Sequence, residues 1–381
     1  MIDAMITAPT LKQYFIDKKN DILRDVIGLV KAESPTLTKK LVDECGDILT
    51  SLIKERLDVQ VTVHEQAERG NHLSFSIGKG KKRILILGHF DTVWEKGKLP
   101  IEVKENKLYG PGVLDMKSGV IQSVWAVKAL KDENLLQDKE IVFLLTSDEE
   151  VGSQTSRELI EAEAKLSDIV LVMEPPVAKT GALKTGRKGV GIYQLRVKGK
   201  STHAGNHHED GRSAIKELAQ QVLKLEGLTD YDKGTTINVG TINGGTRTNV
   251  VPDFAEATID IRVRTMDEAK RIVKVVENLQ PINPGVQVEI EGELNRPPLE
   301  RTEAVVQLFE KVKDSAKELG IDVTEAQVGG ASDGNFTGGL GIPTLDGLGC
   351  PGEGPHAENE HIIIDELPVR TALVAQLIRK L

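Results

Sequence analysis

The sequence predicts an α/β fold, in which a mostly parallel sheet is covered by helices and a smaller α+β domain is inserted. Apolar runs such as "RILILG" at 83–88 and "EIVFLLT" at 140–146 are typical of strands that are buried on both faces. These runs alternate with amphipathic segments, as in a sheet whose strands are joined by helices. After residue 186 the pattern changes to alternating apolar and polar residues, which is typical of half-exposed antiparallel strands.

The elements before residue 186 can be placed in order. Helical periodicity predicts helices over 11–31 and 36–57, separated at Ser34-Pro35. Apolar runs bounded by turn residues predict strands at 59–63, 73–77, 83–88, 140–146 and 168–174. A glycine-rich turn, "GPGVLDMKSGV", opens a helix that ends near residue 131, and a further helix is expected at 153–166.

The later elements indicate an insertion. Helices near 211–226 and 266–279 lie between alternating strands, and 286–293 supplies one more strand, so this part is expected to be an α+β domain. After "NRPP" the buried pattern returns, with helices at 302–319 and 366–380. The sequence therefore predicts one domain from residues 1–185 and 297–381 and an inserted domain from residues 186–296.

The composition excludes some classes of protein. The 381 residues carry a formal net charge of −9, whereas a nucleic-acid-binding domain is expected to be basic. No apolar run approaches the roughly 20 residues of a membrane-spanning helix, and the start shows no signal-peptide pattern, so no membrane association is expected. The only cysteines, Cys45 and Cys350, form no CxxC pair and are expected to be buried thiols of a cytoplasmic protein.

Acidic residues and histidines follow the predicted strands at the ends where ligands bind in open α/β sheets. The strand at 83–88 is followed by a histidine and an aspartate, the strand at 140–146 by three acids, and the strand at 168–174 ends in a glutamate. The glycine-rich turn and the loop "GPHAENEH" add an aspartate and a histidine. The resulting candidates are His89, Asp91, Asp115, Glu149, Glu150, Glu174 and His356.

Carboxylates and imidazoles that converge from separate loops are ligands for zinc or a similar divalent ion. If Asp115, Glu150 and Glu174 bind as carboxylates and the two histidines bind as neutral imidazoles, the ligands carry three negative charges. Two divalent cations exceed that charge by one, which leaves room for a bound hydroxide. We therefore expect two divalent metal ions per chain, zinc by preference, with cobalt or manganese as alternatives.

Individual residues of this set also have structural interpretations. Taken alone, His89 would be a hydrogen-bonded core histidine and Asp115 a helix cap. Asp148 is interpreted as a solvated loop acid and is left out of the site. Glu149 and Glu150, as neighbours in extended chain, are expected to point in opposite directions, so we assign Glu150 to the metal and Glu149 to the role of general base.

Six motifs resemble, in order and spacing, those of the di-zinc metallopeptidases and deacylases: "GHFDTV", "YGPGVLDMKSG", "TSDEEVGS", "MEPP", "STHAG" and "PHAENEHI". That family includes glutamate carboxypeptidases of the carboxypeptidase G type, acetylornithine deacetylase, succinyl-diaminopimelate desuccinylase, aminoacylases, and di- and tripeptidases. The resemblance extends from about residue 15 to the end of the chain. The first two motifs look most similar to the glutamate carboxypeptidase type.

The resemblance implies a role for each candidate residue. The implied metal ligands are His89, Asp115, Glu150, Glu174 and His356, with Asp115 bridging the ions. Asp91 would orient His89, and Glu149 would be the base. Residues 186–296 would form a lid and dimerisation domain, whose His203 polarises the scissile carbonyl in the other subunit of a homodimer.

The resemblance also implies residues that hold the substrate. Asn249 would help to position it, and Arg262 would bind its terminal carboxylate. Because the apolar neighbours of Arg262 alternate inward, its guanidinium projects from the opposite face, although a surface arginine is the alternative interpretation. Gly330 and Ser332 would offer hydrogen bonds from a glycine-rich loop.

One stretch departs from the glutamate carboxypeptidase pattern. The family type carries a Lys-x-Ser stretch before the lid, which recognises the side-chain carboxylate of glutamate. The corresponding residues here are Ala182-Leu183-Lys184. Either Lys184 supplies the charge from a shifted position, or the pocket prefers another amino acid.

Taken together, these patterns predict a metal-dependent hydrolase of the carboxypeptidase type. It would cleave the amide bond of a C-terminal amino acid in small N-acyl or peptidyl substrates, with no nucleic-acid partner. Two alternatives have the same metal-dependent hydrolysis but a different substrate: deacylation of a biosynthetic intermediate of the acetylornithine or succinyl-diaminopimelate type, or cleavage of di- and tripeptides. A third alternative is a non-catalytic, metal-bound binding protein.

Overall fold

The computed structural model describes residues 7–136 and 138–381. The chain divides into two compact units. Unit 1 contains the residues up to Thr185 together with Arg301–Gln327 and Ser332–Leu381, and unit 2 contains Gly186–Glu300 and Val328–Ala331. The expected roles of the two parts, metal-binding domain and lid, stay predictions.

Unit 1 is built on a six-stranded sheet with the strand order β1-β2-β6-β3-β7-β14. The neighbours among β6, β3, β7 and β14 pair in parallel, whereas β2 pairs antiparallel with both β1 and β6. The strands are β1 (Thr62–His64), β2 (His72–Gly78), β3 (Lys82–His89), β6 (Lys139–Thr146), β7 (Ile169–Val172) and β14 (Thr344–Leu345). The prediction of a mostly parallel central sheet is therefore confirmed.

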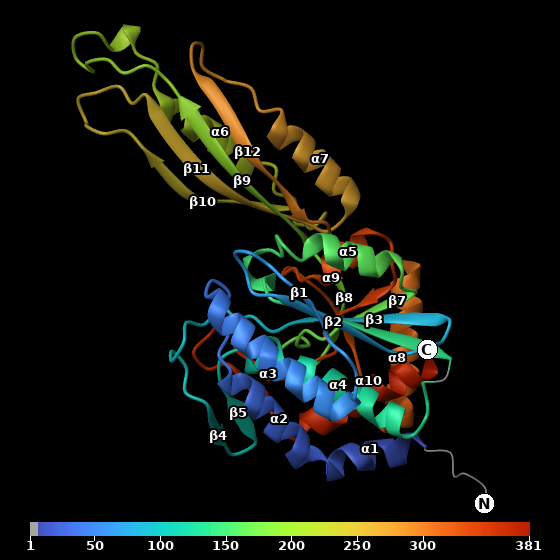
Figure 1. Ribbon diagram of the computed structural model, residues 1–381. Helices are drawn as coiled ribbons and strands as arrows, with labels where there is room; N and C mark the ends of the chain where they lie inside the picture. Colours follow the sequence, from blue (N-terminus) through green and yellow to red (C-terminus); the bar gives the residue numbers. More distant parts are fainter. Residues whose placement is uncertain (1–6, 137) are drawn as a thin grey trace, which may run out of the picture. The chain divides into compact units, whose positions relative to one another are not determined.

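Helices cover both faces of this sheet (Figure 1). Successive residues of β3 explain its uninterrupted apolar run, because Ile84 and Ile86 belong to one buried cluster while Leu85 and Leu87 belong to another, on the side of α5 and α9. The helices are α1 (Ala8–Asp17), α2 (Lys19–Lys31), α3 (Lys39–Leu57), α4 (Ser118–Asp132), α5 (Arg157–Lys165), α8 (Glu303–Glu318), α9 (Gly334–Gly339) and α10 (Glu366–Lys380).

A small second sheet in unit 1 was not predicted. Its order is β15-β16-β5-β4, with β4 (Glu102–Lys104), β5 (Lys107–Tyr109), β15 (Gly352–Glu353) and β16 (His361–Ile363). β5 leads into the glycine-rich turn, β15 and β16 flank the loop "GPHAENEH", and β16 pairs with β5. This pairing joins segments that are about 250 residues apart in the sequence. Strands of two or three residues are too short to show a periodic pattern.

Two further boundaries differ from the prediction. The helix expected at 11–31 consists of α1 and α2, which meet at Lys18. The first strand begins at Thr62 rather than at residue 59. Neither difference alters the sheet.

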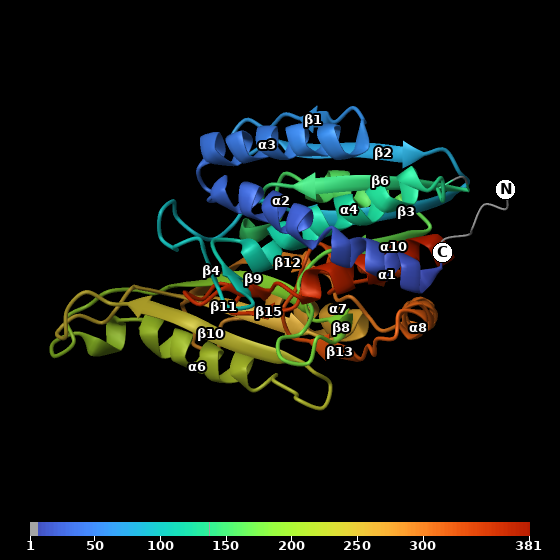
Figure 2. The ribbon, with the colours of Figure 1, turned by 90° about the horizontal axis from the view of Figure 1, so that it is seen from below.

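Unit 2 contains a four-stranded antiparallel sheet with the order β10-β11-β9-β12, on which α6 (Ala214–Glu226) and α7 (Met266–Glu277) pack. Figure 2 shows α6 along β10. The strands are β9 (Gly189–Lys198), β10 (Thr236–Gly244), β11 (Phe254–Val263) and β12 (Gln287–Arg296). Buried and exposed residues alternate along β11, which explains the alternating sequence pattern. The chain passes between the units along β8 (Leu183–Arg187) and β13 (Glu325–Val328), which pair with each other.

Among the residues that the structure describes, no helix combines the length and the apolar character that crossing a bilayer requires.

Candidate metal centre

The five predicted metal ligands meet in unit 1. They form two groups of three side chains, and within each group the ligand atoms lie within 4.8 Å of one another. The first group is His89, Asp115 and Glu174, and the second group is Asp115, Glu150 and His356. His89 is the last residue of β3, and the other four candidates follow β5, β6, β7 and β15, so the carboxyl ends of the central strands and the small sheet together build the site.

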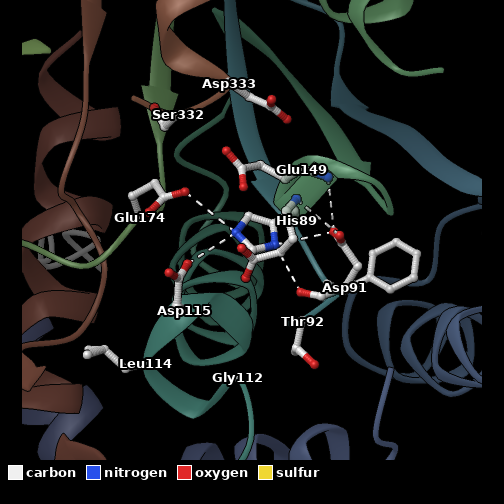
Figure 3. A network of polar contacts seen from close by, with 12 residues as sticks. His89, Asp91, Thr92, Gly112, Leu114, Asp115, Glu149, Glu174, Ser332 and Asp333 are labelled. Carbon is white, nitrogen blue, oxygen red and sulfur yellow. Dashed lines mark hydrogen bonds and ion pairs between the residues drawn. The ribbon is translucent and has the colours of Figure 1, made fainter. Parts of the chain in front are cut away.

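Asp115 belongs to both groups, and its two oxygens point to different rings. Its Oδ1 lies 3.2 Å from Nε2 of His89, and its Oδ2 lies 3.4 Å from Nε2 of His356. Nε2 of His356 is also 3.1 Å from Oε2 of Glu150, and Nε2 of His89 is 3.5 Å from Oε1 of Glu174. Figure 3 shows His89 between Asp115 and Glu174. A carboxylate placed between two imidazoles in this way has the geometry of a bridging ligand.

The acids of this cluster are withdrawn from water. The side chain of Glu150 is 6% exposed and that of Asp115 is 14% exposed, whereas His356 is 53% exposed. Burial raises the pKa of Glu150 to about 7, with a further contribution from the charge of Asp115 and an opposing one from His356. Burial also acts to raise the pKa of Asp115, but hydrogen bonds from His356 and His89 hold that pKa well below its usual value.

The donor set fits a divalent metal. Oε1 of Glu150 is buried and has no hydrogen-bond partner among residues 7–136 and 138–381. A buried carboxylate oxygen without a donor or a cation is costly, so a metal ion bound at this position would stabilise it. Imidazole nitrogens and carboxylate oxygens are the ligands that zinc and similar ions accept.

Asp91 connects the cluster to its surroundings. Nδ1 of His89 faces the backbone oxygen of Asp91 at 3.1 Å and its Oδ1 at 3.4 Å. The same carboxylate accepts the backbone N–H groups of Glu149 and Glu150, each at 3.3 Å, and the hydroxyl of Thr36 at 2.8 Å. Asp91 therefore holds both the imidazole and the turn that carries the two glutamates.

The turn that carries Glu149 and Glu150 differs from the expected extended chain. Residues Glu149–Val151 form a single turn of 3-10 helix. Consecutive side chains of a 3-10 helix are rotated by about 120°, so the two carboxylates still diverge, for a different geometric reason.

The interpretation of Asp148 as a solvated loop acid was wrong. Asp148 is fully buried. Its carboxylate accepts the backbone N–H of Thr155 at 2.7 Å and the hydroxyls of Thr155 and Ser156 at 2.8 and 2.6 Å. The three hydrogen bonds fix the residues just before α5 to Asp148, the residue that precedes the two glutamates. The signal in the sequence was a hydroxyl pair seven and eight residues downstream, which only the folded loop brings within reach.

Glu360 was also missed. It is 1% exposed, and its Oε1 accepts the backbone N–H groups of Leu114 at 2.9 Å and Asp115 at 3.2 Å. Its Oε2 accepts the N–H of Gly112 at 3.1 Å and the indole N–H of Trp94 at 2.7 Å. Glu360 thus ties the loop of His356 to the backbone of Asp115.

Two glycines allow the chain to approach Glu174. A Cβ on Gly119 would lie 2.0 Å from the backbone oxygen of Met173, and a Cβ on Gly349 would lie 2.8 Å from the backbone oxygen of Glu174. Both distances are shorter than any real contact of such a carbon. The glycines therefore let α4 and the loop after β14 close around the end of β7.

In unit 2, His203 and Asn249 lie on paired loops. His203 forms a bridge with Val250, and the N–H of Ala204 donates to the backbone oxygen of Asn249 at 2.9 Å. Nδ1 of His203 accepts the backbone N–H groups of Gly205 and Asn206, each at 3.1 Å. Since Nδ1 is an acceptor, the proton of the neutral ring sits on Nε2.

Arg262 projects from β11 and pairs with Asp260. Its Nε and Nη2 donate to the two oxygens of that carboxylate, both at 2.8 Å. Asp260 therefore takes one edge of the guanidinium, and the Nη1–Nη2 edge is the one that a second carboxylate would use.

The remaining predicted substrate residues are placed differently. The backbone oxygen of Gly330 accepts Nη1 of Arg187 at 3.2 Å. Ser332 is fully buried and donates its hydroxyl to Asp346 at 2.6 Å, which weighs against its predicted hydrogen bond to a substrate. Lys184 lies in β8, where its backbone pairs with Asp346.

The chain is similar to known proteins over nearly its full length. It is 31% identical to carboxypeptidase G2 of Pseudomonas sp. (strain RS-16), over 97% of this chain and 92% of that protein. It is 28% identical to succinyl-diaminopimelate desuccinylase of Dechloromonas aromatica (strain RCB), over 88% of this chain and 93% of that protein.

Two solved structures share the fold. Aminopeptidase PepT from Bacillus cereus superposes with a TM-score of 0.78 at 24% identity, covering 95% of this chain and 98% of that one. The YXEP protein of Bacillus subtilis, described as a dinuclear metal-binding peptidase, superposes with a TM-score of 0.70 at 16% identity, covering 95% and 98%.

A family model matches the part of the chain that carries every predicted metal ligand. Residues 85–380 match the family described as peptidase family M20/M25/M40. With this match and the 31% identity to carboxypeptidase G2, the chain is a hydrolase that belongs to peptidase family M20/M25/M40.

Proposed function

We propose that the chain is a two-metal amidohydrolase that removes the C-terminal amino acid from N-acyl amino acids or short peptides. The observation that supports this most directly is Asp115, whose two oxygens face two different imidazoles within a cluster of buried acids. The similarity to carboxypeptidase G2 supports the leaving group, a C-terminal amino acid.

The five ligands would hold two divalent ions, for which zinc is the preferred choice and cobalt and manganese are alternatives. When bound, such ions polarise a carbonyl and lower the pKa of bound water. Glu149 takes the proton of the attacking water and delivers it to the leaving amine, a role that contributes about two to four orders of magnitude in rate. Asp91 contacts both His89 and the backbone N–H of Glu149 and so holds the two residues in position for this proton transfer.

His203 is the proposed donor to the developing oxyanion. Its Nδ1 is held by two backbone N–H groups, so Nε2 presents an N–H. Residues 186–296 would act as the lid, in a homodimer in which His203 serves the site of the other subunit. Arg262, through its outer edge, and Asn249 would bind the carboxylate of the leaving amino acid.

The test is a panel of kcat/KM values over N-acyl amino acids and dipeptides, combined with metal analysis. We expect close to two divalent ions per chain and loss of hydrolysis on chelation. Glu149→Ala should retain the metals and lose at least a hundredfold in rate, or roughly 3 kcal/mol. The matched control is Glu158→Ala, an exposed glutamate of α5. Full activity of Glu149→Ala would refute its role as base.

A second candidate function is removal of a succinyl group from a diamino acid. The similarity to the Dechloromonas desuccinylase favours it, and the same panel separates the two functions if it includes N-succinyl substrates.

A further inference from the structure

A small cavity adjoins the proposed metal cluster in unit 1. It has a volume of about 350 Å³, near the lower end of ligand pockets. The turn after α2, the loop after β3 and the turn of Glu150 line it. Its apolar wall consists of Pro35, Leu37, Val93 and Val151. We call it the Leu37 pocket.

The rim of the Leu37 pocket exposes apolar side chains to water. Leu37 is 72% exposed and Val93 is 43% exposed. Because Glu150 also lines the cavity, a group bound there is adjacent to the proposed metal cluster. Covering the two rim side chains with an apolar group would remove this surface from water.

The charges of the Leu37 pocket decide which part of a substrate it can take. None of the described residues that line it is a lysine, arginine or histidine, whereas two of them, Glu95 and Glu150, are acids. The leaving amino acid of an N-acyl substrate always carries a carboxylate, which requires a cation or several N–H donors. A neutral acyl group needs neither a cation nor several N–H donors.

We infer that the Leu37 pocket is the subsite for the acyl group and that it selects a neutral, apolar acyl group over an anionic one. The inference rests on the proposed function and specifies its substrate class. A benzoyl or branched aliphatic group matches the apolar wall. A succinyl group would place its carboxylate beside Glu95, and no lysine, arginine or histidine among the described lining residues would neutralise it, which disfavours this group.

The test compares two substrates that differ only in the acyl group, N-benzoyl and N-succinyl derivatives of one amino acid. The wild-type protein should prefer the benzoyl substrate in kcat/KM by about tenfold or more. Leu37→Lys removes an apolar contact and adds a cation at the rim, so it should lower this preference by about tenfold. Val103→Lys, at an exposed valine of β4 that does not line the pocket, is the matched control and should leave the preference unchanged.

A second measurement is independent of turnover. In the metal-loaded protein, the methyl NMR signals of Leu37, Val93 and Val151 should shift on addition of benzamide and should not shift with succinamate. Equal effects of Leu37→Lys and Val103→Lys, a wild-type preference for the succinyl substrate, or unshifted methyl signals with benzamide would each overturn the subsite. Failure of the metal-loaded protein to hydrolyse any N-acyl amino acid or short peptide would instead overturn the proposed function, and the subsite with it.

Discussion

Each unit contains a glutamate whose side chain is withdrawn from water, but the hydrogen bonds to the two carboxylates differ. In unit 2, Glu217 is fully buried, yet its carboxylate accepts the backbone N–H groups of Ile282 at 2.8 Å and Asn283 at 2.7 Å, together with side-chain amides of Asn283 and Gln221. Burial acts to raise the pKa of Glu217, but these hydrogen bonds lower it below the usual value. In unit 1, Glu150 lies beside Asp115 and His356, its Oε1 has no hydrogen-bond partner among the described residues, and burial raises its pKa to about 7.

The difference separates a structural acid from a binding acid. Burial alone does not distinguish the two residues, since both are withdrawn from water. What distinguishes them is the supply of donors: Glu217 accepts four hydrogen bonds, whereas Oε1 of Glu150 accepts none from the described residues, and we propose that a metal ion takes that place. The following predictions test this distinction, from the largest expected effect to the smallest.

The largest effect is expected when the charge of Asp115, the acid shared by both groups of candidate ligands, is removed. Asp115→Asn keeps the shape of the side chain but weakens both groups of ligands at once. We expect kcat/KM to fall by at least about a thousandfold, because the metals contribute several kcal/mol. Asp132→Asn, at the end of α4, is the control and should keep full activity. A variant with two bound metals and near-normal kinetics would disprove the bridging role of Asp115.

The next test concerns Glu360. It resembles Glu217 because it accepts four hydrogen bonds, although it lies beside the proposed metal cluster. Each oxygen of Glu360 accepts two N–H groups, so the amide nitrogen of Glu360→Gln would face two donors in either orientation. Since Asp115 would then be held less firmly, zinc affinity should fall by about 10- to 100-fold in a chelator competition.

The control for Glu360 lies in the same loop. Glu358→Gln removes the same charge at an exposed position and should bind zinc as the wild type does. A change in the fluorescence of Trp94, recorded in a Trp125→Phe background, would report the lost indole contact. Equal zinc affinities of the two variants would rule out the role of Glu360.

For Glu217 the expected loss is in stability. Glu217→Gln should lower the free energy of unfolding by about 1–3 kcal/mol at pH 7 and leave the metal content unchanged. Because the folded pKa is lowered, the stabilisation is fully present above the unfolded pKa of about 4.3 and is lost as the pH falls through the folded pKa. Urea titrations at several pH values should therefore show the two proteins converging in acid, whereas the exposed Glu209→Gln should match the wild type throughout.

The smallest effect is expected for Glu150→Gln in the chelated protein. A neutral amide relieves the repulsion from Asp115 but weakens the contact with His356, so stability should stay within about 1 kcal/mol of the wild type. The midpoint of thermal unfolding in excess chelator measures this. If Glu150→Gln destabilised the chelated protein as much as Glu217→Gln does, the distinction between binding and structural acids would fail.

Much of this arrangement could be predicted from the sequence. The strands at 83–88 and 140–146 have strong apolar runs, and the ligands that follow them are found where the parallel sheet requires them. The domain-sized change of pattern near residue 186 lies at the boundary between the two units. These features depend on local periodicity or on the general topology of α/β sheets.

The residues that were missed depend on contacts that only the folded chain forms. Glu360 accepts hydrogen bonds from segments about 250 residues away in the sequence, and Asp148 accepts them from residues seven and eight positions downstream, which only the folded loop brings within reach. The small sheet that brings Asp115 and His356 together contains strands of two or three residues, which carry no periodic signal. The pair of Arg262 and Asp260 is a different case, because the two residues lie two positions apart on one face of β11 and strand alternation alone places them side by side.

The discontinuity of unit 1 has a consequence for the protein during its synthesis. The segment that supplies β14, α10, Glu360 and His356 follows unit 2 in the chain, so a ribosome translates unit 2 before it reaches these residues. A nascent chain that lacks this segment leaves uncovered the surfaces of α4 and β7 on which the segment packs, and it also lacks Glu360 and His356 of the proposed metal cluster. We therefore expect a product truncated before this segment to show no hydrolysis.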